Sequence, residues 1–225
     1  FGVFALFLRR WLEETPVFLA MKADAALEAG LPLTRVLRDH RAQIWPSMLL
    51  TGFLSVGIVT LTLLTPSILQ TQFSYPASDA LEANSIAIIC LTFGCIFWGW
   101  LADRIGAYRV LLLGSLALAA SSYVFYHALP AEVGHTTLLY SIAGFSLGSV
   151  AVVPMILVGL FPPAVRYSGF SFSYNVAYSI FGGFAPMLVA YWLKSDVLAP
   201  AHLLTIVCVF AVAMALYLPL KEKRP

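Results

Sequence analysis

One acidic and two basic side chains stand close together in the segment 99–109, which reads GWLADRIGAYR. An aspartate at the end of one helix can pair with a base or cap the positively polarised N-terminus of a neighbouring helix. Because glycines permit a tight turn and close helix approach, such a segment can latch a helix bundle in one state and release it in another. The predicted gate residues, with one base from the turn at 161–169, are Gly99, Asp103, Arg104, Gly106, Arg109 and Arg166.

A polar stripe follows in the segment 170–193, where residues three and four positions apart share one helix face. The stripe consists of Ser171, Asn175, Tyr178, Gly182 and Pro186. Asparagine and tyrosine need hydrogen-bond partners in an apolar medium, so this face should meet protein or water. We predict that Asn175 and Tyr178 line a substrate cavity. Hydrogen bonding between helices is the alternative interpretation.

A second set of hydroxyls, including Thr51 and Ser55, lies at helical spacing in 46–70, and Pro66 can break that helix near its far end. We place Thr51 and Ser55 beside the same cavity, although such hydroxyls can also bond back to their own helix. The pair Gly144 and Gly148 forms a G-x-x-x-G spacing, which predicts tight helix packing. Further along the same segment, Pro154 can kink the helix.

Other reactive side chains form no recognisable site. The three cysteines lack a C-x-x-C spacing, and the four histidines show no E-x-x-H or H-x-x-x-H pairing. The sequence contains no phosphate-binding loop, nucleophile elbow or pair of carboxylates on one helix face. We therefore expect no catalytic residue, no metal and no cofactor, and we do not interpret the chain as an enzyme.

The amino-acid composition indicates the class of protein in which these residues lie. Of the 225 residues, 60% are hydrophobic and 11% are charged, whereas soluble domains carry about 25% charged residues. The mean hydropathy is +0.88. This balance excludes a disordered chain and predicts a polytopic membrane protein embedded in a lipid bilayer. The net charge of only +2 gives no indication of a nucleic-acid partner.

Six segments contain no Asp, Glu, Lys or Arg and are long and apolar enough to indicate membrane helices. These segments do not alternate polar with apolar residues, so membrane strands are excluded. The sequence thus predicts an all-α bundle over 46–220. The six segments are 46–70, 84–100, 110–127, 137–160, 170–193 and 202–220.

The distribution of lysine and arginine predicts the orientation of these helices. Of the 13 basic residues, Lys194 alone lies in one of the three loops 71–83, 128–136 and 194–201. By the positive-inside rule the opposite side is cytoplasmic, and it carries the C-terminus and the gate residues. In an alternative interpretation of 99–109, its arginines serve only to fix this topology.

The two ends of the chain differ in character. Residues 1–8 are apolar and precede Arg9 and Arg10, as expected for the end of a truncated transmembrane helix. Residues 9–45 mix acids and bases, which indicates a cytoplasmic linker along the membrane face, and residues 221–225 form a cytoplasmic tail. The chain therefore reads as the later part of a longer protein.

The segment 99–109 resembles the loop signature G-x-L-A-D-R-x-G of the major facilitator superfamily, although Ala107 and Tyr108 replace two usual basic residues. The segment 10–18 resembles the one that follows helix six in these transporters. The segment 161–175, FPPAVRYSGFSFSYN, with GGFAP at 182–186, is similar to the metabolite:proton symporter family. That family includes proline/betaine, 2-oxoglutarate, citrate and shikimate carriers.

The resemblance implies that the six segments are helices 7–12, the C-terminal half of a secondary active transporter in the cell (inner) membrane. Such a protein carries a small polar metabolite, an organic acid or a zwitterion, together with protons. No ionisable side chain lies well inside a span, so the proton-coupling group is expected in a partner N-terminal half. A membrane sensor or receptor without transport, or a channel, is the alternative.

Overall fold

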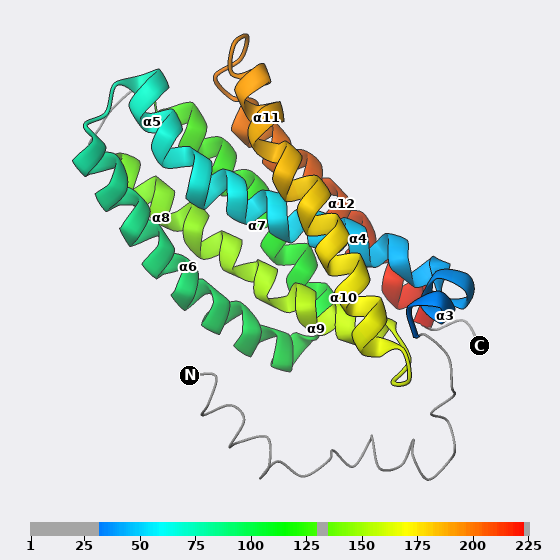
Figure 1. The fold of residues 1–225 in the computed structure, drawn as a ribbon. Coiled ribbons are helices and arrows are strands. Elements are labelled where there is room, and N and C mark those ends of the chain that lie inside the picture. The colour runs from blue at the N-terminus through cyan, green and yellow to red at the C-terminus, as the bar shows by residue number, and fades with distance from the viewer. Residues whose placement is uncertain (1–31, 130–134, 223–225) are drawn as a thin grey trace, which may run out of the picture.

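The computed structural model describes residues 32–129 and 135–222 (Figure 1). Within these ranges all regular secondary structure is helical. Several sequence predictions lie outside the described residues. They are the truncated helix at 1–8, the linker up to residue 31, the motif at 10–18 and the last three residues of the tail.

A short helix, α3 (Pro32–Asp39), precedes six long helical segments. The bounds are as follows: α4 (Arg41–Ile58), η1 (Val59–Leu64) and α5 (Thr65–Phe73) form the first; α6 (Ala77–Ile105) the second; α7 (Ala107–Ala128) the third; α8 (Thr136–Leu147), η3 (Gly148–Ala151) and α9 (Val152–Leu160) the fourth; α10 (Arg166–Ala177), η4 (Tyr178–Gly182) and α11 (Gly183–Trp192) the fifth; and α12 (Ala199–Glu222) the sixth.

The six charge-free segments lie inside these six helical segments, except that the fifth helix ends at Trp192 and leaves Leu193 in the following turn. Five of the six are long and apolar enough to cross a membrane. The fifth, which runs from α10 to α11, is not among them because serine, tyrosine and asparagine fill α10. The structure is therefore an all-α bundle whose least apolar member is the helix with the polar stripe.

Three of the long helices contain a segment that departs from α-helical geometry. The segments η1 and η4 are π-helices, and η3 is a 3₁₀-helix. Each precedes a proline, namely Pro66, Pro154 or Pro186. A proline ring clashes with the carbonyl four residues earlier, which favours a local departure from α-helical geometry. In all three cases that carbonyl lies in the irregular segment. Pro66 does not break its helix, because the chain remains helical up to Phe73. Pro46 in α4 and Pro219 in α12 have no such irregular segment before them.

The helices run back and forth, so the connections collect at two ends (Figure 1). One end carries α3, the α6–α7 turn, the α9–α10 loop and the last turn of α12. Arg35, Arg38, Arg104, Arg109 and Arg166 belong to this basic end. The other end holds Lys194 as its one basic residue among those the structure describes.

Glycines bring α6 and α8 into backbone contact. A Cβ atom at Gly144 would lie 2.4 Å from the Ala87 carbonyl oxygen, and one at Gly148 would lie 2.4 Å from the Gly94 carbonyl carbon. Real Cβ atoms do not approach so closely, so both positions need glycine for this packing. The prediction of tight packing from the G-x-x-x-G spacing is confirmed. On the other side of η3, the Ser149 side chain occupies the place of a Cβ at Gly114 on α7.

Candidate functional site

The α6–α7 turn is built on one unusual glycine. Gly106 has φ 94° and ψ 145°, a backbone region that only glycine adopts readily. Its N–H donates to the Ala102 carbonyl at 2.9 Å, and its own carbonyl accepts from Val110 N at 3.2 Å. Gly106 thus ends α6 and starts α7 in one residue, and this sharp turn carries the predicted gate charges.

The charged side chains of the α6–α7 turn are exposed on the outside of the helix bundle. Asp103, Arg104 and Arg109 are exposed. The Arg104 guanidinium lies 4.4 Å from the centroid of the Trp100 ring, in a cation–π arrangement. Among the described residues Asp103 forms no ion pair, so the acid is available to a partner that approaches this end. Gly99, one turn earlier, has nothing within 4 Å of an added Cβ.

Arg166 lies at the same basic end but does not contact the α6–α7 charges among the residues that the structure describes. It is half-buried as the first residue of α10, and its Nε donates to the Phe161 carbonyl at 3.2 Å. The Phe161 ring in turn packs on Gly169, where an added Cβ would lie 2.4 Å away. Arg166 therefore closes the α9–α10 loop onto the first turn of α10.

Thr51 and Ser55 lie between helices. Both are fully buried, and their hydroxyls donate to carbonyls of α4 itself, Thr51 to Ser47 at 2.8 Å and Ser55 to Gly52 at 3.3 Å. A Cβ at Gly182 would lie 3.5 Å both from the Ser55 Cβ and from the Tyr178 ring. Ser55, Gly182 and Tyr178 are therefore neighbours across the interface of α4 and η4.

Asn175 and Tyr178 lie further out on the fifth helical segment. Asn175 is exposed, and its Nδ2 donates to the Ser171 carbonyl at 2.7 Å and to the Ser171 Oγ at 3.3 Å. The half-buried Tyr178 ring has its centroid 5.6 Å from that of Tyr174. Ser55 and Tyr178 thus both lie beside Gly182, and Asn175 lies on an open face one turn away from Tyr178.

Sequence reasoning missed a buried hydrogen-bond network around η1. Tyr126 and Thr65 join their hydroxyls at 2.6 Å, and the Thr65 hydroxyl also contacts the Thr60 carbonyl at 3.0 Å. The Tyr140 hydroxyl lies 2.5 Å from the Leu61 carbonyl oxygen. A π-helix leaves its carbonyls less regularly paired than an α-helix does. The Tyr140 hydroxyl from α8 reaches one of these carbonyls directly, and Tyr126 from α7 is linked to another through the Thr65 hydroxyl.

The signal for this network was present in the sequence. Tyr126 and Tyr140 lie in charge-free segments, and a buried tyrosine hydroxyl needs a polar partner. Tyr140 also lies 2.6 Å from Asn84 Oδ1, and its ring stacks on Phe125 with centroids 4.8 Å apart. The partners were not predictable, because Tyr140 and Leu61 are separated by 79 positions.

Two grooves open between the helices. One of about 470 Å³ lies between α5 and α11 at the end opposite the basic one, with Gln72 and Lys194 in its wall. The other, of about 340 Å³, is apolar and lies between α4, α11 and α12. None of the four predicted cavity residues lines either groove. Within the described ranges no three His, Cys, Asp or Glu side chains come together as a metal site requires.

The sequence matches the family model of the Major Facilitator Superfamily over residues 1–186. The chain is 31% identical over 224 residues to a protein named as a proline/betaine transporter in Staphylococcus aureus, covering 97% of this chain and 48% of that protein. It is 30% identical over 195 residues to a shikimate transporter of Escherichia coli, covering 83% and 43%. An ectoine/proline transporter of Corynebacterium glutamicum is 24% identical over 240 residues, covering 100% and 47%.

The apolar helices and the family match together define a polytopic membrane protein. The chain spans about half the length of the curated relatives it matches. It belongs to the Major Facilitator Superfamily.

Proposed function

We propose that this chain is the C-terminal half of a proton-coupled symporter, which carries a small carboxylate-bearing metabolite by alternating access. The observation that carries the proposal is the exposed Asn175 in the fifth helical segment of a superfamily member. An amide in hydrocarbon loses its hydrogen bonds with water, so the face that carries it must meet protein or a water-filled cavity. A second helical bundle of similar size, the N-terminal half, would supply both the protein surface and the walls of such a cavity.

The cavity wall on this side consists of Asn175 and Tyr178, with Thr51 and Ser55 behind them. The Tyr178 ring and the Ser55 side chain both lie next to Gly182, each 3.5 Å from where its Cβ would be. The amide of Asn175 offers both a donor and an acceptor to a polar solute. The π-helix η4 makes this helix a candidate for movement, because π segments are frequent at functional sites.

The gate lies at the basic end, which the positive-inside rule makes cytoplasmic in the cell membrane. Asp103, Arg104 and Arg109 project from a turn whose geometry Gly106 fixes, and Asp103 has no ion-pair partner among the described residues. Its partner is then a base or a helix N-terminus of the other half. Gly99, with open space beside it, allows that half to approach α6 closely, and Arg166 holds the α9–α10 loop in place.

The substrate is an organic acid or a zwitterion. The relatives are named for proline, betaine, ectoine and shikimate, and all four solutes carry a carboxylate. The spans of this chain offer no cationic side chain to that group, nor an acid for proton coupling. The N-terminal half therefore supplies both, by way of an ionisable side chain buried near the midplane.

The proposal is tested with the intact transporter that contains this chain, reconstituted in liposomes. Uptake of radiolabelled proline, betaine and shikimate is measured with and without an acidic outer solution. We expect saturable uptake of at least one solute that rises with the proton gradient. Uptake whose rate does not change with the proton gradient would exclude proton symport. Binding of a solute without uptake would favour a sensor or receptor. Conductance without saturation would favour a channel.

The gate has its own test in the variant Asp103→Asn. We expect uptake to fall at least about fivefold, which corresponds to the lower end of typical coupling free energies between two sites. Expression and folding should be retained. The matched control is Asp79→Asn on the first turn of the same helix, where Asp79 is exposed and accepts a hydrogen bond from Ser78 Oγ at 2.8 Å. Equal uptake by the Asp103→Asn protein and the wild type would rule out the gate.

A further inference from the structure

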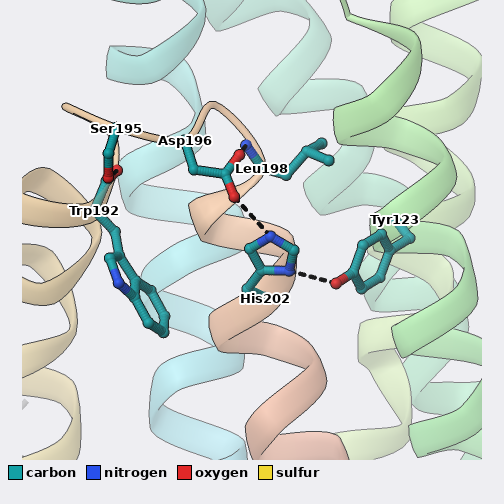
Figure 2. A network of polar contacts seen from close by, with 6 residues as sticks. All are labelled: Tyr123, Trp192, Ser195, Asp196, Leu198 and His202. Atoms are coloured by element: carbon teal, nitrogen blue, oxygen red, sulfur yellow. Dashed lines mark hydrogen bonds and ion pairs between the residues drawn. The ribbon is translucent and has the colours of Figure 1, made fainter.

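A chain of three polar side chains joins the α11–α12 corner to α7 (Figure 2). His202, in the first turns of α12, has its Nε2 2.8 Å from Asp196 Oδ2 in the corner. Its Nδ1 faces the hydroxyl of Tyr123 on α7, at hydrogen-bonding distance. The other carboxylate oxygen of Asp196 accepts the Leu198 N–H at 2.8 Å. The imidazole is thus the middle link between two elements that are distant in sequence.

We propose that His202 is a proton-binding site at this end of the bundle, and that proton binding tightens the attachment of the α11–α12 corner to α7. The neutral ring donates from Nε2 to Asp196 and accepts the Tyr123 hydroxyl at Nδ1. A proton binds at Nδ1, and the Tyr123 hydroxyl then turns so that its oxygen accepts. Both contacts persist, and the Asp196 contact becomes an ion pair.

The surroundings give this site access to the solution. The side chains of His202 and Asp196 are 35% and 47% exposed. The Trp192 ring lies edge-on to the imidazole, with centroids 6.5 Å apart. Figure 2 shows the histidine between the corner and α7, with the carboxylate on one side and the phenol on the other.

The elements packed against α12 are α7, α11 and α4, and the charged residue of α4 is Arg41, which lies at the opposite, basic end. On α7 the titratable groups near the imidazole are Tyr123 and, one turn further, the exposed His127. On α11 and the corner they are Asp196, the exposed Tyr191 and Lys194, and the Lys194 side chain lines the groove towards α5. The next titratable residue on α12 itself is Cys208.

The Asp196 carboxylate offers a permanent negative charge to a proton on the neighbouring ring. The Leu198 N–H, and then the hydrogen bond from His202, hold the pKa of Asp196 below its ordinary value. Histidine is the side chain whose ordinary titration falls between about pH 5 and 8. The interval from pH 7.5 to 5.5 lies above the titration of the Asp196 carboxylate, so that carboxylate keeps its charge throughout the test.

The test is hydrogen–deuterium exchange of the corner amides in the intact protein, held in lipid nanodiscs. The amides of Leu193, Ser195 and Asp196 all donate to carbonyls at the end of α11, so their exchange reports opening of the corner. After correction for intrinsic rates, we expect exchange at pH 5.5 to be about two- to fivefold slower than at pH 7.5, the size of an exposed ion pair. A ratio near one in the wild type would overturn the proposal.

Four variants locate the effect. His202→Gln and Asp196→Asn should each bring the pH ratio close to one, because either removes the ion pair. His127→Gln is the matched control, since it removes an exposed histidine at the same end and should keep the wild-type ratio. Tyr123→Phe should speed exchange of the corner about twofold or more at both pH values, because the link to α7 is lost. A pH ratio that survives His202→Gln, or no effect of Tyr123→Phe, would contradict the proposal.

Discussion

The two motif glycines Gly99 and Gly106 should respond oppositely to the same substitution. Neither has any atom within 4 Å of an added Cβ, so alanine meets no steric clash with neighbours at either position. Gly99 lies within α6 with an ordinary backbone, whereas Gly106 has φ 94° and ψ 145°. The difference between the two alanine variants therefore measures backbone conformation alone.

Gly106→Ala should lower the free energy of unfolding by about 1–3 kcal/mol, the cost of holding a residue with a side chain in this backbone region. Gly99→Ala should leave it unchanged or raise it by up to about 1 kcal/mol, because alanine is the better helix former. The assay is denaturant-induced unfolding of the intact protein in mixed micelles, followed by tryptophan fluorescence and checked by circular dichroism.

A Gly106→Ala protein as stable as Gly99→Ala would refute the reasoning, since it would show that the turn relaxes to an ordinary backbone at no cost. Uptake measured on the same two proteins adds a second comparison. If the other half packs on α6 at Gly99, Gly99→Ala should reduce uptake without reducing stability. The two glycines of one motif would then serve different ends, a turn in one case and a helix contact in the other.

Three further predictions concern the rest of the bundle. Tyr140→Phe should lower the free energy of unfolding by about 1–3 kcal/mol, because it leaves the buried Leu61 carbonyl without its side-chain donor; Tyr191→Phe, at an exposed position, is the control in the same unfolding assay. Gly148→Val should cost more than about 3 kcal/mol and reduce the folded yield in detergent gel filtration, because its Cβ falls on the α6 backbone. The stabilisation from ionised Asp196 is present above its ordinary pKa and is lost as pH falls through its lowered pKa. Acidification below about pH 4 should therefore speed amide exchange of the corner in the wild type. The Asp196→Asn protein should not show this change.

The positions of the helices followed from where charges are missing. A span that carries a charge in hydrocarbon is costly, so each charge-free segment marks a helix interior. Most helices extend beyond their segment, but the fourth ends with it at Leu160 and the fifth ends one residue short of it at Trp192. Gly144 and Gly148 were also predictable as a packing face, because their spacing places both on one side of α8. The partner surface at Ala87 and Gly94 was not predictable, because spacing along one helix does not specify which other helix it meets.

The irregular segments depended on more than the sequence shows. Pro66, Pro154 and Pro186 each follow an irregular segment, yet that segment is a π-helix in two cases and a 3₁₀-helix in one. The helices packed around the two kinds of segment make different contacts with them. Around η1 the Tyr140 hydroxyl from α8 reaches the Leu61 carbonyl of the π-helix, and the Tyr126 hydroxyl from α7 bonds to the Thr65 hydroxyl. By contrast, η3 lies against Gly94 on α6 and Gly114 on α7.

The predicted cavity residues differ in whether other helices of this chain bury them. Thr51 and Ser55 are buried within this chain, where their hydroxyls bond to their own helix. The hydrogen bond from Asn175 to Ser171 is also local, yet Asn175 remains exposed at the tenth position of the helical segment 166–192. Local hydrogen bonds are visible in the sequence pattern, but exposure depends on which helices pack around a residue.

The exposed Asn175 bears on what must cover this chain. If lipid covered that face, the amide would keep one bond to Ser171 and lose its remaining hydrogen-bonding capacity in hydrocarbon, at a cost of several kcal/mol on alkane transfer scales. The neighbouring Tyr174 and Tyr178, both half-buried, would face the same loss for their hydroxyls. A water-filled cavity closed by a second bundle removes that cost and leaves these groups free to bind a polar solute. The same polarity that makes the fifth helical segment the least apolar of the six is therefore what a carrier needs on the wall of its transport path.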